Sequence, residues 1–116
     1  MSDQDCLFCK ILNGDIPADL VYESDSAIAF RDVNPQAPTH VLIIPRQHIA
    51  TINALQPGDE AVVGSLYMVA QAVAQQEGIA EEGYRAVMNC NAAAGQTVFH
   101  IHLHVLGGRG MAWPPG

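Results

Sequence analysis

Three histidines, His100, His102 and His104, alternate with aliphatic residues and are the side chains of this sequence best suited to chemistry. Side chains alternate between the two faces of a β-strand, so the three imidazoles would share one face. The aliphatic residues between them predict an opposite face that packs in the core. Neither strand propensity nor packing accounts for three imidazoles in a row, so a functional site is the better interpretation.

Two kinds of chemistry fit three imidazoles on one strand face. Alternating histidines can ligate zinc or iron, which would make a metal site. Alternatively, an imidazole with its unperturbed pKa of about 6.5 is largely neutral at pH 7, so it can attack phosphorus and form a covalent intermediate. Its neighbours could then donate hydrogen bonds to the phosphate oxygens as charge develops there. The spacing alone does not choose between these two.

The loop before the histidines favours phosphate chemistry. It offers Asn89, Gly95, Gln96 and Thr97, which are hydrogen-bonding groups and accessible backbone suited to an oxyanion or a leaving group. A hydrolytic metal site would instead need nearby carboxylates or further histidines, together with a general base.

The cysteines form a second group with ligand spacing. Cys6 and Cys9 make a C-x-x-C pair, which supplies two of the four ligands of a structural zinc. The alternative is two reduced thiols on one face of a short helix, where residues three apart are neighbours. A redox role is disfavoured because no βαβ pattern accompanies the pair. Cys90 makes the count odd, which argues against a disulfide framework, and we expect it to be inert and at least half-buried.

The hydrophobic pattern predicts an α+β fold in which one long helix packs on an antiparallel sheet. The expected helices cover residues 6–14 and 59–77. The buried stripe of the second comprises Ala61, Val62, Leu66, Val69, Ala70 and Val73. The expected strands cover residues 20–23, 27–32, 40–44, 84–89 and 98–106, and the first two form a hairpin. Loops are expected at 34–38 and 91–96, and the tail 111–116 can be neither helix nor central strand.

Composition restricts the class of protein. The 116 residues are 49% hydrophobic, which suits one domain with a buried core. The formal net charge of −7 disfavours binding to nucleic acid, although a local pocket could still hold a mononucleotide. The sequence has no apolar run of about 18 residues and no signal-peptide pattern, so we expect a cytoplasmic protein without a membrane partner.

The segment from His100 to Leu106 resembles the His-φ-His-φ-His-φ-φ signature of the histidine triad (HIT) superfamily, where φ is apolar. Further segments are similar to the Hint branch, the purine nucleoside phosphoramidases. They are residues 16–18, 30–32, 35–40, 95–96, 106–109 and 113–116. The resemblance runs from about residue 6 to the end of the chain.

This resemblance implies a single HIT domain over residues 1–116, with a five-stranded antiparallel sheet, one long helix and a short N-terminal helix. It implies a homodimer with a continuous sheet, in which the tail 107–116, including Trp113, lies at the interface near the active site. The implied activity is hydrolysis of adenosine 5′-phosphoramidates or aminoacyl adenylates to AMP through a nucleotidyl-histidine, with no cofactor. The alternative is a nucleotide-binding regulatory or adaptor protein with little turnover, which would not require an intact His102.

The resemblance also implies a role for each histidine. His102 is the nucleophile, and His104 donates a hydrogen bond to a nonbridging phosphate oxygen. His100 supports the geometry, and His40 orients the triad from the neighbouring strand. The implied contacts to the phosphate and leaving group come from Asn89, Gly95, Gln96 and Thr97, the last standing where many relatives have serine.

Nucleoside contacts follow from the same resemblance. Asp32 is the implied ribose ligand, because a carboxylate can accept hydrogen bonds from two vicinal hydroxyls. From the sequence alone, a turn-capping aspartate is an equal alternative. The implied base pocket consists of Leu7, Phe8, Ile11, Ile16, Phe30, Val33 and Leu42. Composition alone would assign these residues to ordinary core.

A structural zinc site is the last implication. Some bacterial relatives complete a C-x-x-C pair with a histidine after the His40 strand and with the first triad histidine. In this sequence the four ligands would be Cys6, Cys9, His48 and His100, away from the nucleophile.

Overall fold

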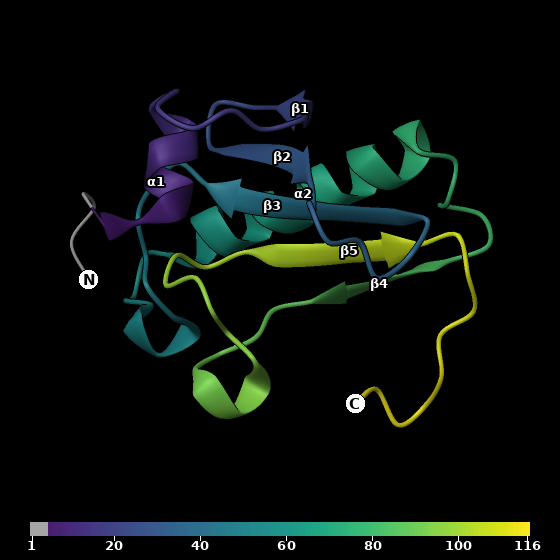
Figure 1. The fold of residues 1–116 in the computed structure, drawn as a ribbon. Coiled ribbons are helices and arrows are strands. Elements are labelled where there is room, and N and C mark those ends of the chain that lie inside the picture. The colour runs from purple at the N-terminus through teal and green to yellow at the C-terminus, as the bar shows by residue number, and fades with distance from the viewer. Residues whose placement is uncertain (1–4) are drawn as a thin grey trace.

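The computed structural model describes residues 5–116 and forms an open five-stranded sheet with the strand order β1-β2-β3-β5-β4 (Figure 1). Every neighbouring pair of strands is antiparallel. The strands are β1 (Leu20–Glu23), β2 (Ala27–Arg31), β3 (Thr39–Pro45), β4 (Tyr84–Val87) and β5 (Leu103–Gly107). The helices are α1 (Leu7–Leu12) and α2 (Glu60–Gln76), and short 3-10 turns cover Ile52–Ala54 and Ala92–Ala94.

The long helix α2 covers one face of the sheet, behind the strands in the view of Figure 1. Its apolar stripe packs on the strand residues that point to this face, and together they form the main core. The fully buried members include Val41, Ile43, Leu66, Val73, Ile101, Leu103 and Val105. This predicted layer is confirmed, except that Ala61, expected in the stripe, is exposed.

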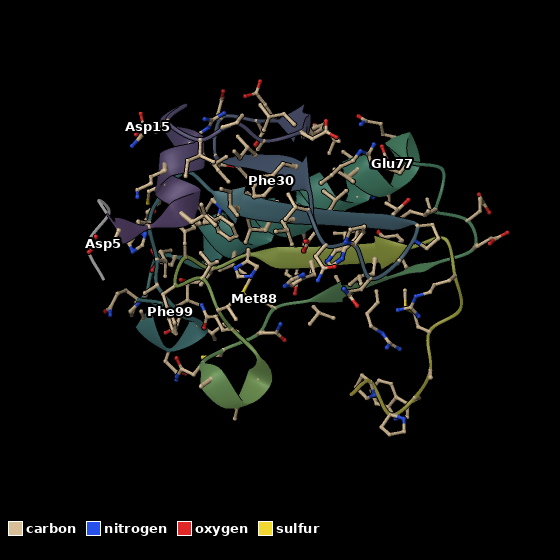
Figure 2. All side chains as sticks on the ribbon, viewed as in Figure 1. Asp5, Asp15, Phe30, Glu77, Met88 and Phe99 are labelled. Atoms are coloured by element: carbon tan, nitrogen blue, oxygen red, sulfur yellow. The ribbon has the colours of Figure 1, made fainter. Side chains whose placement is uncertain are left out.

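A smaller apolar cluster lies between α1 and the other face of the sheet. It consists of Cys6, Phe8, Cys9, Ile28, Phe30, Leu42 and Ile44. Figure 2 shows all side chains in the view of Figure 1, with Phe30 labelled on β2. Because strand side chains alternate, the histidines of β3 and β5 point to this face, opposite α2.

The last strand is shorter than predicted. The expected strand 98–106 is replaced by β5, Leu103–Gly107, so of the triad only His104 lies in the sheet ladder. The pairing of Ile43 with Leu103 would bring Pro45 opposite Ile101, and proline has no N–H to continue the ladder. The N–H of Ile101 instead donates to the carbonyl of Ile49 at 2.7 Å. The inward alternation survives, because Ile101, Leu103 and Val105 are all buried in the main core.

Most bounds of the other helices and strands differ from the predicted ones by one or a few residues. The hairpin β1–β2 is confirmed, with β1 as predicted and β2 ending at Arg31 rather than at 32. The strand expected at 84–89 ends at Val87, whereas β3 extends one residue beyond each expected end. Helix α2 is one residue shorter at each end, because Asp59 and Glu77 are its caps. The loop 91–96 contains a 3-10 turn at Ala92–Ala94. None of the described helices is long and apolar enough to cross a membrane.

An ion pair that the sequence did not reveal joins β2 to the end of α2. Arg31 donates two hydrogen bonds to the carboxylate of Glu77, at 2.9 and 3.1 Å. The hydrogen bond from Arg31 holds the pKa of Glu77 below its ordinary value. This bidentate contact fixes the position where β2 ends, directly before Asp32.

Gly107, at the end of β5, packs closely against Ile79, which follows α2. A Cβ at this position would lie 2.6 Å from the Cδ1 atom of Ile79 and 3.0 Å from its Cβ atom. We therefore expect Gly107→Ala to lower the free energy of unfolding by about 1–3 kcal/mol, the usual cost of overpacking a core. Gly110→Ala is the matched control, since nothing lies within 4 Å of its added Cβ. Urea unfolding measures both variants, and equal stabilities would contradict this packing.

Candidate active site

His102 is held by a backbone carbonyl that sets which of its ring nitrogens carries the proton. Its Nδ1 atom lies 2.8 Å from the carbonyl oxygen of His100. A carbonyl only accepts hydrogen bonds, so Nδ1 carries the proton and donates. In the neutral ring, the Nε2 atom of His102 therefore has a free lone pair, which is the state of a nucleophile.

His40 and His104 form a hydrogen-bonded proton relay that starts from the backbone. The N–H of Gln36 donates to Nδ1 of His40 at 3.0 Å, so the proton of a neutral His40 is on Nε2. That Nε2 atom lies 2.9 Å from Nδ1 of His104 and donates to it. In a neutral His104 the proton is then on Nε2, where it can be donated to a bound anion. The two neighbouring rings, His102 and His104, thus present opposite functions at Nε2.

The surroundings favour the neutral form of these rings. Burial lowers the pKa of His102, with the backbone bond to His100 and the charge of Asp32 acting in the opposite direction. Burial, followed by the neighbouring rings of His102 and His40, lowers the pKa of His104 to about 4. Burial also lowers the pKa of His40, against the charge of Asp32. Each of these shifts favours the neutral ring at pH 7, as the proton relay requires.

An apolar cavity of about 540 Å³ lies on the same face of the sheet, between α1 and β2. Its volume and apolar lining are typical of small-molecule sites. It gathers the predicted base-pocket residues Leu7, Phe8, Ile11, Ile16, Phe30, Val33 and Leu42, together with Asp32. Phe8, Phe30 and Leu42 are also buried members of the smaller cluster, so the core and pocket interpretations of these residues both hold. Pro17, Ala18 and Asp19 line the cavity as well and were not predicted.

Asp32 lies where the cavity meets the histidines. Its Oδ1 atom accepts from the N–H of Asn34 at 2.8 Å, which is the turn-capping arrangement considered from the sequence. Its Oδ2 atom lies 3.4 Å from Nε2 of His40. The carboxylate therefore caps a turn, lines the cavity and approaches the histidine relay at once.

The predicted contact residues in the loop before His100 take different positions. Asn89 lines a cavity of about 270 Å³ that also contains His40 and His104. The side chain of Gln96 is buried and braces the loop, because it accepts from the N–H of Asn91 and donates to the carbonyls of Ala50 and Val98. Gly95 has a φ of +91°, which favours glycine. Thr97 is exposed.

Two arginines that sequence reasoning left aside line the cavity beside His104. Arg85 extends from β4 and donates to the carbonyl of Ala112 at 2.9 Å. Arg109 donates to the carbonyl of Gln36 at 3.1 Å. Both guanidinium groups thus fasten the C-terminal tail near the histidines. The alternation along β4, where Arg85 pairs with Leu106 and Val87 with His104, could have indicated this face.

The four predicted zinc ligands come together at the N-terminal end of α1. The Sγ atom of Cys6 lies 3.3 Å from Nδ1 of His100, and the Sγ atom of Cys9 lies 3.5 Å from the same nitrogen. The Nδ1 atom of His48 lies 3.3 Å from Sγ of Cys9 and 3.2 Å from Nδ1 of His100. Around a tetrahedral zinc, neighbouring ligand atoms would be separated by about 3.3 Å for two nitrogens and about 3.6 Å for sulfur and nitrogen. The residues therefore fit this metal.

The hydrogen bonding of His100 supports the same conclusion. Its Nε2 atom lies 2.8 Å from the carbonyl oxygen of Pro45 and must donate to it. The Nδ1 atom of a neutral His100 is then unprotonated and faces the thiols and His48, as a metal ligand would. Backbone carbonyls commonly orient ligating histidines in this way, by accepting from the ring nitrogen that does not bind the metal.

A second group of ligand types, Asp32, His40 and His104, also has atoms within 4.8 Å of one another. In this group, however, Nε2 of His40 and Nδ1 of His104 are directed at each other across 2.9 Å. Their separation is that of an N–H···N hydrogen bond, shorter than the edge of about 3.3 Å expected between two nitrogen ligands. The arrangement suits a proton relay better than a metal.

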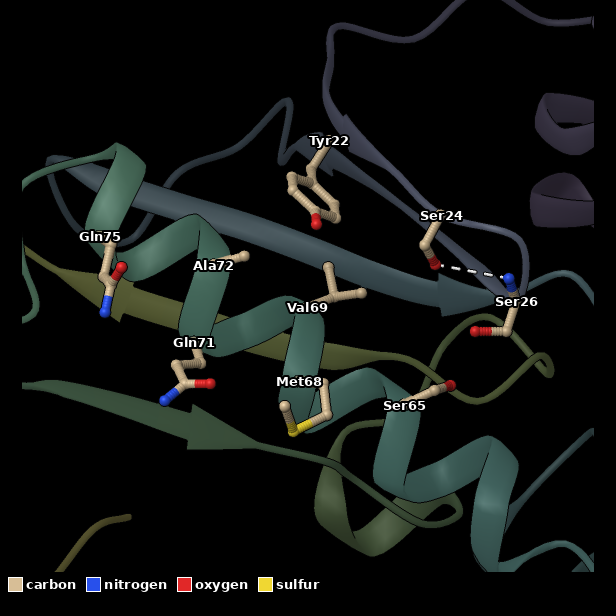
Figure 3. Close-up of a pocket in the computed structure, with 9 residues that line it drawn as sticks. All are labelled: Tyr22, Ser24, Ser26, Ser65, Met68, Val69, Gln71, Ala72 and Gln75. Atoms are coloured by element: carbon tan, nitrogen blue, oxygen red, sulfur yellow. Dashed lines mark hydrogen bonds between the residues drawn. The ribbon is translucent and has the colours of Figure 1, made fainter.

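A further cavity of about 530 Å³ lies between the β1–β2 hairpin and α2, on the face away from the histidines (Figure 3). Hydroxyl and amide groups, including those of Tyr22, Ser65 and Gln75, line it. No acidic, basic or metal-ligating histidine or cysteine side chain is among the described residues that line it, and we assign it no chemistry.

Comparisons with known proteins agree with this geometry. The family model of the HIT domain matches residues 13–111. A purine nucleoside phosphoramidase of Escherichia coli strain K12 is 51% identical over 106 residues, which cover 91% of this chain and 89% of that protein. An uncharacterised HIT-like protein of Synechococcus elongatus is 52% identical over 113 residues, 97% of this chain and 98% of that protein. The crystal structure of a HIT family hydrolase from Legionella pneumophila matches with a TM-score of 0.94 at 55% identity, covering 97% of this chain and 100% of that chain. This chain therefore belongs to the HIT domain family.

Proposed function

We propose that this protein hydrolyses purine nucleoside 5′-phosphoramidates, and the related aminoacyl adenylates, through a covalent nucleotidyl-histidine. The proposal rests mainly on two neighbouring imidazoles, His102 and His104, whose ring centres are 5.0 Å apart. One presents a lone pair and the other an N–H, as attack on phosphorus requires. The similarity to the E. coli protein named a purine nucleoside phosphoramidase supports the substrate class.

In the first step, Nε2 of His102 attacks the α-phosphorus and forms a P–N bond, while the bond from phosphorus to the leaving group breaks. The amine that leaves a phosphoramidate takes a proton from solvent, whereas the carboxylate that leaves an aminoacyl adenylate needs none. His104 donates its Nε2–H to a nonbridging oxygen, where charge develops. His40 keeps His104 in the donating tautomer. Asn89, Gly95, Gln96 and Thr97 would contact the phosphate and the leaving group, Gln96 through the backbone.

In the second step, water attacks phosphorus and breaks the bond to Nε2 of His102. The water returns one proton to solvent, so the products are AMP and the neutral imidazole. Throughout both steps the carbonyl of His100 keeps the ring of His102 in place. The purine would occupy the apolar cavity beside α1, and Asp32 would accept hydrogen bonds from the ribose hydroxyls. These residues and water suffice, so the reaction needs no cofactor.

A nucleotide-binding regulatory or adaptor protein with little turnover is the alternative function. Binding alone needs the apolar cavity and a phosphate donor such as His104. It does not need an unprotonated Nε2 atom on His102, in a ring whose Nδ1 atom donates to a backbone carbonyl at 2.8 Å. This fixed tautomer favours the enzyme.

We further propose that Cys6, Cys9, His48 and His100 hold a structural zinc ion. The proposal is supported by the 3.2–3.5 Å spacing of their ligand atoms and by the tautomer of His100. Such an ion would stabilise the fold, because it binds the folded chain and has no preformed site in the unfolded one. It would supply no catalytic step.

A homodimer joined along β4 is our proposal for the assembly. β4 is one of the two edges of the sheet, and its residues Tyr84 and Ala86 are exposed. The other edge, β1, has a register irregularity between Leu20 and Tyr22, a feature that discourages edge pairing. Arg85 ties the tail to β4, so the exposed Trp113 would lie near a partner on this edge.

His102→Ala removes the proposed nucleophile and tests the covalent mechanism. We expect the turnover of an adenosine 5′-phosphoramidate to fall by about a thousandfold or more, a typical loss for a missing nucleophile. Binding of AMP, measured by calorimetry, should change little because the cavity and His104 remain. A variant that retains most of its rate would show that no nucleotidyl-histidine is formed.

Cys6→Ser tests the zinc proposal without removing the helix cap. Cys6 is the N-cap of α1 and accepts from the N–H of Cys9, and serine is a good N-cap that is a poor zinc ligand. Elemental analysis should find about one zinc per chain in the parent and in Cys90→Ser, and much less in Cys6→Ser. Chelation should lower the melting temperature of the parent and of Cys90→Ser, but not that of Cys6→Ser. Full zinc content in Cys6→Ser would contradict the site.

Ala86→Glu tests the proposed dimer edge. In a symmetric dimer both copies of the new carboxylate enter the β4 interface, so we expect dimer dissociation to rise at least about tenfold in sedimentation experiments. Leu20→Glu adds the same charge to the opposite edge and should leave the dimer intact. Dissociation caused by Leu20→Glu instead would assign the interface to β1.

A further inference from the structure

The short helix α1 contributes to two sites at once. Its N-terminal turn supplies Cys6 and Cys9 to the cluster of metal-ligand atoms. The two residues between them, Leu7 and Phe8, line the apolar cavity, as does Ile11 in the next turn. A helix of six residues is not stable alone in water, so its position depends on these side-chain contacts.

Phe8 connects the two sites directly. Its side chain is buried and meets the ring of His100 edge to face, with ring centres 6.0 Å apart. The same ring meets His102 at 5.0 Å and 88°, and Phe30 across the cavity wall at 5.6 Å. One aromatic ring therefore touches a proposed metal ligand, the proposed nucleophile and the proposed base pocket.

His100 provides a second connection through its own backbone. Its ring faces the thiols of Cys6 and Cys9, whereas its carbonyl accepts from Nδ1 of His102. Its Nε2 atom donates to Pro45. A change in the position of His100 would therefore move both the carbonyl that holds His102 and the ring that contacts Phe8.

We propose that metal and nucleotide bind with positive coupling, and that Phe8 is the positioning residue that transmits it. With a metal on its thiols, α1 holds Leu7 and Phe8 in place, so the base pocket is formed before nucleotide arrives. A purine in the cavity presses Phe8 and α1 toward the sheet, which keeps the thiols at the ligand distance. The inference rests on the proposed nucleotide and zinc sites, but neither site alone requires it.

Linkage makes this coupling reciprocal. If metal tightens nucleotide binding by some factor, nucleotide must tighten metal binding by the same factor. Coupled sites in proteins typically show factors of about 5–150. We expect about tenfold here, because the ring of Phe8 contacts both His100 and His102, and the carbonyl of His100 adds a second connection.

Competition for zinc between the protein and a chromophoric chelator, measured at equilibrium, provides the test, with AMP as the nucleotide. Saturating AMP should reduce the zinc transferred, so that the apparent dissociation constant for zinc falls about tenfold. The zinc-free protein should bind AMP about tenfold more weakly by calorimetry, which is a measurement independent of turnover.

Two variants distinguish a loss of coupling through Phe8 from damage to the nucleotide pocket. Phe8→Leu keeps an apolar side chain in the cavity but removes the ring contacts to His100 and His102, so zinc and AMP should still bind while the coupling falls well below its parent value, to the part carried by His100. Phe30→Leu alters the same cavity wall without a ring contact to His100, so it should weaken AMP but preserve the coupling.

Each contrary result has a distinct meaning. Zinc transfer that is unaffected by AMP, in a protein that binds both, overturns the coupling and leaves both sites standing. Full coupling in Phe8→Leu overturns the role of Phe8. A protein that binds no zinc overturns the metal site and the coupling together, and a protein that binds no AMP overturns the proposed function and the coupling together.

Discussion

The position of one proton on each of four imidazole rings is set by the backbone, and the chemistry of the site depends on it. Carbonyls of His100 and Pro45 accept from His102 and His100, and the N–H of Gln36 donates to His40, which in turn donates to His104. Backbone groups cannot reverse their donor or acceptor character. The rings are therefore prepared for their roles before any substrate arrives.

These backbone groups are available because the ladder between β3 and β5 ends at the pair Ile43–Leu103. Pro45 lacks an N–H, so β5 begins only at Leu103 and the segment before it is released from the ladder. The freed carbonyl of Pro45 accepts from His100, and the carbonyl of His100 is in turn available to His102. A regular strand through the whole triad would have engaged these backbone groups in strand pairing instead.

The sequence was sufficient to predict the features that follow from periodicity. The alternation of the triad, the α2 stripe, the hairpin and the antiparallel sheet were all foreseen, and the C-x-x-C pair predicted where α1 would carry its thiols. Features that depend on distant partners were not foreseen. Nothing local indicates that Arg31 pairs with Glu77, that Gln96 braces its own loop, or that Phe8 meets His100 and His102. The strand start at Leu103 depends on Pro45, which is 58 positions away, since 103 − 45 = 58.

The most direct test of this account is the protonation of the four rings, read from the ¹⁵N chemical shifts of the histidine side chains near pH 7. We predict neutral rings with the proton on Nδ1 in His102, and on Nε2 in His40, His100 and His104. The shift of His102 should respond to AMP without a change of tautomer. A neutral His102 that carries its proton on Nε2 would contradict the account, because the atom assigned to attack phosphorus would have no free lone pair.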